Sequence, residues 1–194
     1  MNIGRIIKGV GGNYYVSAKG KIYKCSARGK FRKAKITPTV GDYVQFTILD
    51  ENECEGALDT IEKRKNILLR PRVANIDCAI ITFAATSPDI NRDLLDRFLI
   101  LAETQNIPKV IICINKSDLV SQEEKDAFAN IYEPYYKVVF TSAEKNIGID
   151  QLKEEIHGCE SVFAGPSGVG KSSLINRLIP ESNRQTGEIS RKIE

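Results

Sequence analysis

Apolar positions follow two different spacings along this 194-residue chain. In the first 70 residues, β-branched and aromatic residues form short runs between turns rich in Gly, Lys and Pro, with no helical stretch. From Asp77 onward, continuous apolar runs of strand length alternate with stretches whose apolar residues recur at helical spacing. The change predicts two modules, residues 1–70 and 71–194, with the segment 64–77 as connector and Pro71 ending the first module.

The first module reads as a series of short strands. Its apolar runs lie at 4–10, 13–18, 21–27 and 42–49. Four or five strands at this spacing predict a small all-β barrel of the oligonucleotide-binding type, the OB-fold.

The second module reads as alternating strands and helices. Its continuous apolar runs lie at 77–85, 108–116, 137–143 and 161–165, and its helical stripes at 93–105, 121–136 and 148–156. Ser121 followed by Glu124 is a capping box that opens the middle helix. Strands that are apolar on both faces and alternate with helices predict a doubly wound, mostly parallel α/β sheet.

A glycine-rich stretch follows the last apolar run and matches the phosphate-loop pattern GxxxxGK[ST] without a mismatch. A strand precedes it and the helix-forming segment 172–179 follows it, which favours a phosphate loop over a chance Gly/Ser-rich turn. Lys171 is expected to bridge the β- and γ-phosphates, and the Ser172 hydroxyl to hold Mg²⁺. The residues predicted to bind phosphate are Gly165, Pro166, Ser167, Gly168, Val169, Gly170, Lys171, Ser172 and Ser173.

Asn115, Lys116, Ser117 and Asp118 form an NKxD motif at the end of the second buried run, where such sheets bind ligands. The Asp118 carboxylate can accept from guanine N1–H and the 2-amino group, a donor pair that adenine lacks. Asn115 is expected to bond N7 and to join neighbouring loops, while the Lys116 stem covers the base plane. The same four residue types also make an ordinary turn, so the motif indicates guanine binding only in combination with the phosphate loop.

Thr141, Ser142 and Ala143 end the next strand and resemble a third guanine-binding element, in which the Ala143 amide would meet O6. Thr-Ser after a strand is also a common helix cap, and the tripeptide alone decides nothing.

Charge is divided unevenly along the chain. Residues 1–70 carry a net charge of +7, residues 71–160 carry −6 and residues 161–194 carry +2. A segment of the first module holds five Lys/Arg in eight positions, with an aromatic residue between them and Tyr23 nearby. It fits either an RNA contact, through phosphate neutralisation and base stacking, or a solvated hairpin with a packed Phe. The candidate RNA contacts are Arg28, Lys30, Phe31, Arg32, Lys33 and Lys35.

The remaining composition points to a reduced, soluble protein. The five cysteines include no CxxC pair and predict structural thiols, and His157 receives no catalytic role. No apolar run is long enough to span a membrane, and the N-terminus has no signal-peptide pattern, so a cytoplasmic protein without a membrane partner is expected.

The guanine motifs precede the phosphate loop, which reverses the usual GTPase order and indicates a circular permutation. With the basic barrel, this order resembles the ribosome small-subunit-dependent GTPase A family over essentially the whole chain. The stretches that carry the resemblance are "GDYVQF", "RPRVANID", "LLDRFL", "NKSD" and "FAGPSGVGKSSLIN". It implies Mg²⁺-dependent binding of GTP and GDP, hydrolysis stimulated by the small ribosomal subunit, and a role in late maturation of that subunit. With it, the basic segment favours contact with 16S-type rRNA.

The chain departs from the family after its phosphate-loop helix. The family continues with a switch threonine, a DxxG element and a C-terminal zinc domain, whereas here no DxxG follows Ser172. We therefore expect a C-terminally incomplete chain without the zinc ligands, in which the strand 161–164 lies at a sheet edge. Such a chain is expected to be a monomer that binds GTP and hydrolyses it poorly.

Two other functions stay open from the sequence. One is a P-loop ATPase or kinase in which NKSD is accidental, and the other is an RNA-binding protein with a non-hydrolysing nucleotide site. Guanine selectivity that depends on Asp118 separates the first from a GTPase.

Overall fold

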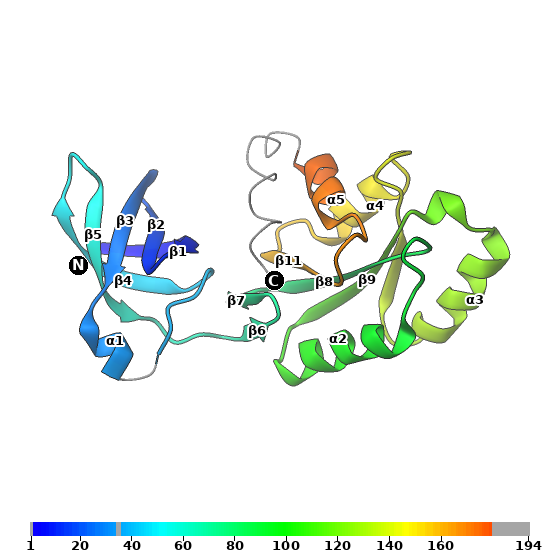
Figure 1. The fold of residues 1–194 in the computed structure, drawn as a ribbon, viewed down its shortest axis with the longest axis horizontal. Coiled ribbons are helices and arrows are strands. Elements are labelled where there is room, and N and C mark those ends of the chain that lie inside the picture. The colour runs from blue at the N-terminus through cyan, green and yellow to red at the C-terminus, as the bar shows by residue number, and fades with distance from the viewer. Residues whose placement is uncertain (1, 34–35, 180–194) are drawn as a thin grey trace. The chain divides into compact units, whose positions relative to one another are not determined.

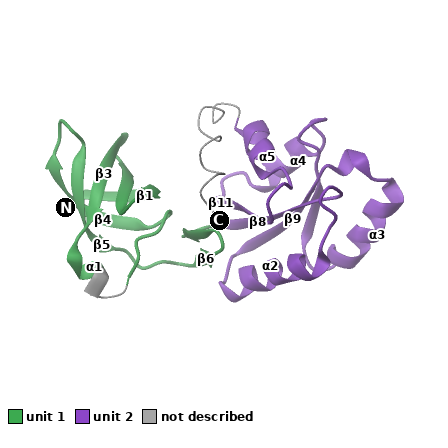
Figure 2. Ribbon diagram, in the orientation of Figure 1, with its two compact units in different colours: residues 1–76 green, residues 77–194 purple. Residues whose placement is uncertain are grey.

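The computed structural model of the chain describes residues 2–33 and 36–179. It divides into two compact units, Met1–Ile76 and Asp77–Glu194 (Figure 2). Each unit has a hydrophobic core of its own.

The first unit contains a closed five-stranded barrel, as predicted. Its strands are β1 (Asn2–Val10), β2 (Asn13–Ala18), β3 (Lys21–Ala27), β4 (Tyr43–Asp50) and β5 (Glu55–Ile61), paired in the order β1-β2-β3-β5-β4. All neighbouring pairs are antiparallel except β3 and β5, which are parallel. Alternate side chains such as Tyr23 and Cys25 on β3, and Val44 and Phe46 on β4, fill the interior.

A short helix, α1 (Gly29–Lys33), lies between β3 and β4, so the expectation of no helix in this module is wrong. Phe31 explains the helix, because its ring is 6% exposed and packs into the barrel core. Burial of this ring stabilises a helix whose other residues are Gly, Lys and Arg.

The predicted connector forms a hairpin of β6 (Ile67–Leu69) and β7 (Arg72–Ala74), with Pro71 in its turn. Arg64 fastens the start of this segment to the barrel, because its Nε and Nη2 donate to the two oxygens of the fully buried Asp42 carboxylate at 2.7 and 2.8 Å. Asn75 fastens its end by donating to the Gly41 carbonyl at 3.0 Å.

The second unit is a parallel sheet covered by helices on both faces, as predicted (Figure 1). Its strands are β8 (Cys78–Ala84), β9 (Lys109–Asn115), β10 (Lys137–Phe140) and β11 (Ser161–Ala164), in the order β10-β9-β8-β11. Its helices are α2 (Arg92–Thr104), α3 (Gln122–Tyr132), α4 (Ile149–Glu155) and α5 (Lys171–Leu178), with a 3₁₀ turn, η1, at Ser117–Leu119. Within the described ranges β11 is therefore an edge strand.

The alternation of side chains decides which helix covers which face. Cys78, Ile80, Ile111 and Cys113 belong to one core cluster with residues of α4 and α5. Phe83 and Phe140 contact Phe98 of α2 and Phe128 of α3, respectively. Every residue of β8 is buried, as its continuous apolar sequence predicts.

The capping box predicted at the start of the middle helix is confirmed. Ser121 and Glu124 form the reciprocal capping box of α3. The five cysteines are free, and burial raises the pKa of the Cys113 thiol to about 12, which makes it inert at neutral pH. Among the described helices, none is long and apolar enough to cross a membrane.

Candidate functional site

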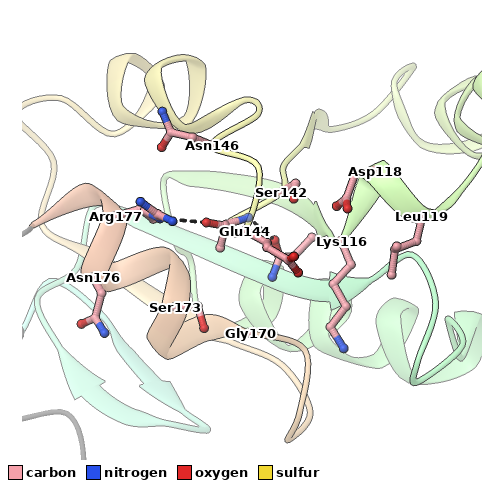
Figure 3. Close-up of a pocket in the computed structure, with 12 residues that line it drawn as sticks. Lys116, Asp118, Leu119, Ser142, Glu144, Asn146, Gly170, Ser173, Asn176 and Arg177 are labelled. Atoms are coloured by element: carbon pink, nitrogen blue, oxygen red, sulfur yellow. Dashed lines mark hydrogen bonds between the residues drawn. The ribbon is translucent and has the colours of Figure 1, made fainter.

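The three sequence motifs meet at the carboxyl ends of the parallel strands. NKSD follows β9, Thr141–Ala143 follow β10, and the glycine loop joins β11 to α5. Each contributes to the lining of a cavity of about 690 Å³ (Figure 3), to which the glycine loop 165–172 contributes Gly170 alone. Its lining residues are Asn115, Lys116, Asp118, Leu119, Ser142, Ala143, Glu144, Asn146, Gly170, Ser173, Asn176 and Arg177.

Asn115 joins the motifs to one another. Its side chain is 2% exposed, and its Nδ2 donates to the Val169 carbonyl of the glycine loop at 2.9 Å. Its Oδ1 accepts from the Ala143 amide at 3.1 Å and from the Thr141 hydroxyl at 3.4 Å. One buried amide therefore fixes the glycine loop and the 141–143 loop relative to β9.

Lys116 and Asp118 lie on the open side of this cluster. Lys116 has a left-handed backbone, with φ 59°, and its Nζ donates to the Ser87 carbonyl in the loop after β8. A hydrogen bond from the Ser142 side chain lowers the pKa of the Asp118 carboxyl, which keeps it ionised at neutral pH. The structure does not bring Ser117 to the cavity, because this residue is fully buried.

The glycine loop has the backbone that its sequence predicts. Gly165, Gly168 and Gly170 have positive φ values of 142°, 80° and 92°. The Lys171 ammonium donates across the loop to the carbonyls of Gly165 and Pro166, at 3.0 and 2.5 Å. Burial lowers the pKa of this ammonium, because the surrounding loop removes part of its hydration.

The residues present fit Mg²⁺ that arrives with a nucleotide. Ser172 lies in the first turn of α5 beside Lys171, and a hydroxyl there is the usual protein ligand of such a cation. No group of three or more metal-ligating His, Cys, Asp or Glu side chains occurs among residues 2–33 and 36–179. Phosphate and water would therefore supply most of the coordination.

Sequence reasoning missed several lining residues, namely Leu119, Glu144, Asn146, Asn176 and Arg177. A signal for the last two was present. A helix that starts at Lys171 and presents Ser173 to the cavity also presents the residues three and four positions further on.

The basic segment of the barrel has the packed Phe of the second alternative, although on a helix and not in a hairpin. Phe31 is buried in the core, so its ring offers no free face for base stacking, and Tyr23 is 5% exposed. Arg28 pairs with Asp59 at 2.9 Å, and Lys30 lies over the Phe31 ring, 5.9 Å from its centroid. Arg32 and Lys33 lie on α1, and Lys35 lies outside the described residues.

A glycine loop on the last strand, preceded by the two guanine-type motifs on earlier strands, defines a circularly permuted P-loop GTPase domain. The RsgA GTPase family model matches residues 61–194, and the RsgA N-terminal domain model matches residues 3–57. The chain belongs to the RsgA GTPase family.

Named relatives agree with this assignment. The chain is 51% identical, over its full length, to the small ribosomal subunit biogenesis GTPase RsgA of Alkaliphilus metalliredigens, of which it covers 66%. It is 47% identical to the protein of that name from Agathobacter rectalis, with 98% of the chain and 67% of the relative covered. The chain thus spans about two thirds of the length of these curated relatives.

Solved structures show the same fold. YjeQ from Thermotoga maritima is 34% identical with a TM-score of 0.78, over 92% of this chain and 65% of that one. YloQ, described as a circularly permuted GTPase, is 43% identical with a TM-score of 0.72, over 93% and 65%.

Proposed function

We propose that this chain is the guanine-nucleotide-binding part of a GTPase that acts in biogenesis of the small ribosomal subunit. The observation that carries the proposal is the Asn115 side chain, which joins both base motifs and the phosphate loop around one cavity. The function of the named relatives supports the ribosomal part.

Base recognition is assigned to the two loops after β9 and β10. Asp118 accepts from guanine N1–H and the 2-amino group, and the second N–H of Asn115 Nδ2 donates to N7. The Ala143 N–H, which donates to Asn115 Oδ1 at 3.1 Å, would share its one hydrogen between that oxygen and O6. Lys116 is tethered at its tip to the Ser87 carbonyl, so its aliphatic stem can lie along the base plane.

Phosphate binding is assigned to the glycine loop and α5. The Lys171 ammonium exchanges its two loop carbonyls for phosphate oxygens, which carry full negative charge and bind it more strongly. The backbone amides at the start of α5 add the partial positive charge of a helix N-terminus. Mg²⁺ bound with the nucleotide neutralises phosphate charge, and Ser172 contributes its hydroxyl to that ion.

Turnover by the 194-residue chain is proposed to be slow. P-loop NTPases hold Mg²⁺ with an additional Asp and position water with a further side chain. No Asp follows Ser172 in this sequence, and no candidate metal cluster occurs in the described ranges. Turnover faster than about 10⁻² s⁻¹, the rate of a GTPase with its arginine in place, would refute this part.

The first unit is proposed to contact 16S-type rRNA through its excess of cations, and the protein to act as a cytoplasmic monomer. Of the candidate RNA contacts, Phe31 is buried and cannot stack on a base. The positive charge of the first unit is therefore the remaining support for the RNA contact. The resemblance assigns zinc to a C-terminal domain of the family, and no zinc ligand is proposed among the residues of this chain. Affinity for small subunits is therefore expected to fall steeply between 50 and about 200 mM salt.

Calorimetric titration tests the nucleotide site. Wild type, Asp118→Ala and the control Asp126→Ala, an exposed carboxylate on α3, are titrated with GDP, a GTP analogue and ADP in Mg²⁺. We expect guanine ligands to bind at least about 100-fold more tightly than ADP, a preference that Asp118→Ala removes and Asp126→Ala keeps. Equal affinity for GDP and ADP would favour the ATPase or kinase alternative. Because slow turnover is expected of this chain, the non-hydrolysing RNA-binding protein would be favoured only if a chain extended past Glu194 bound GTP tightly and did not hydrolyse it in the presence of small subunits.

A further inference from the structure

Ala143 is bonded through both of its backbone polar groups to side chains from other elements. Its N–H donates to Asn115 Oδ1 at 3.1 Å, and its carbonyl accepts from Arg177 Nε at 2.8 Å (Figure 3). The residue itself is 7% exposed. Two bonds on either side of one Cα leave the Ala143 backbone little freedom to rotate.

Arg177 reaches this carbonyl from α5, the helix that begins at the phosphate loop. The bond from Asn115 Nδ2 to the Val169 carbonyl returns to that same loop. The hydrogen bonds therefore form a closed circuit from the phosphate loop through α5 to the 141–143 loop, and back through Asn115.

We propose that Arg177 is a positioning residue for guanine recognition, which holds the Ala143 amide toward the purine 6-position. The inference rests on the proposed function. Guanine O6 is an acceptor, whereas adenine carries an amino group at the same place. A fixed backbone N–H therefore stabilises bound guanine, whereas with adenine this N–H and the 6-amino group are two donors that face each other. An amide that rotates freely loses this discrimination.

The proposal requires a donor at the Nε position rather than a positive charge, because the acceptor is a neutral carbonyl. Gln places an amide nitrogen the same number of bonds from Cα as Arg Nε. Met has the same reach at that position without a donor. Arg177→Gln and Arg177→Met are therefore a matched pair, and Arg97→Met on the exposed side of α2 is a control for loss of charge.

The test compares GDP, ADP and 2-aminopurine riboside 5′-diphosphate, which keeps the 2-amino group and lacks both O6 and the N1 proton. Arg177→Met is expected to lower the affinity for GDP about tenfold, the value of one hydrogen bond. Its affinities for the other two ligands are expected to change less than about twofold. Arg177→Gln and Arg97→Met are expected to keep the wild-type affinity for GDP within about twofold. Amide exchange of Ala143 without nucleotide is expected to accelerate in Arg177→Met and not in Arg177→Gln.

The outcomes separate this inference from the function on which it rests. If wild type binds GDP no better than the 2-aminopurine ligand, the O6 contact and with it the base assignment fail. If wild type prefers GDP and Arg177→Met keeps the full preference, the role of Arg177 alone is wrong. Equal weakening of all three ligands, or failure of Gln to restore GDP affinity, would also overturn it. Exchange of the Ala143 amide tests the role of Arg177 even where a variant binds no nucleotide, and unchanged exchange in Arg177→Met would overturn that role.

Discussion

The three glycines of the phosphate loop share a positive φ but differ in what an added Cβ would contact. At Gly168 the nearest atom is Pro88 Cδ, at 4.0 Å. At Gly170 a Cβ would lie 2.3 Å from Asn115 Nδ2, a side-chain atom. At Gly165 it would lie 2.0 Å from the Thr82 carbonyl oxygen, a backbone atom of β8. An alanine substitution is therefore expected to disturb a different contact at each of the three positions.

The magnitudes follow from these contacts. A left-handed backbone costs a non-glycine residue about 1–2 kcal/mol, and this is the whole expected loss of stability in Gly168→Ala. Gly165→Ala adds an overpacking cost of about 1–3 kcal/mol, because neither backbone can yield without displacing the loop from β8. Displacement disrupts two or more charge-assisted bonds to phosphate, so GDP and ADP should both weaken about 100-fold or more.

Gly170→Ala should behave differently again. The new methyl group pushes the Asn115 side chain away from the Val169 carbonyl and from the base. GDP should weaken by about 10- to 100-fold, while ADP, which does not depend on the guanine contacts, should change little.

Urea denaturation gives the stabilities of the three variants, and calorimetry with GDP and ADP gives their affinities. The order of destabilisation should place Gly165→Ala first and Gly168→Ala last. Gly168→Ala as damaging as Gly165→Ala would refute the steric reasoning. If Gly170→Ala lost affinity for ADP as well as for GDP, Asn115 would not be the group that the added methyl displaces.

Three further substitutions test other parts of the structure. Lys171→Met should abolish phosphate binding and change the pH dependence of the unfolding midpoint. The folded-state pKa of Lys171 is lowered, so burial of the charged amine costs the wild type stability below that pKa, and this cost shrinks as pH rises toward 10.5. The wild-type midpoint should therefore rise relative to that of Lys171→Met across that range. Asp42→Asn should cost about 3–5 kcal/mol in urea unfolding, because Arg64 loses its buried partner, whereas Glu51→Gln in the exposed pair with Lys21 should shift the midpoint little. Phe31→Ala should cost about 3–5 kcal/mol by the same assay, and Tyr135→Ala, at a side chain 80% exposed, less than about 0.5; similar effects of the two would contradict the core position of Phe31.

Most of the fold follows from sequence spacing because strand and helix periods differ. The strand in the run 77–85 is apolar except for Thr82, and the strand in the run 108–116 is apolar between its polar ends Lys109 and Asn115, which identifies strands buried on both faces. The short helix α1 could not be predicted in this way, since five residues contain too little periodicity. Its formation depends on the burial of Phe31 in the barrel core, which includes residues distant in sequence such as Ile6 and Phe46.

The site, like the fold, has parts that the sequence predicts and parts that it does not. Motifs with fixed spacing, such as Gly165–Ser172 and Asn115–Asp118, can be placed from sequence because each one consists of consecutive residues. Arg177 could not be given a role, because its bond to the Ala143 carbonyl joins residues 34 positions apart and uses a backbone acceptor. A backbone acceptor leaves no trace in the residue types, so contacts of this kind have to come from the structure.

The permuted order changes which contacts of the site are local. Asn115 and Thr141 are 26 positions apart, whereas Asn115 bonds the phosphate loop across 54 positions. At the start of β11, the bond from the Glu160 amide to the Asp77 carboxylate spans 83 positions. The base half of the cavity therefore closes smaller chain loops than the phosphate half, and entropy favours its earlier formation. In the described sheet β11 pairs with β8 alone, through four residues. A nucleotide that contacts both halves adds a bridge beside this short ladder, so its binding energy also stabilises the last strand of the sheet.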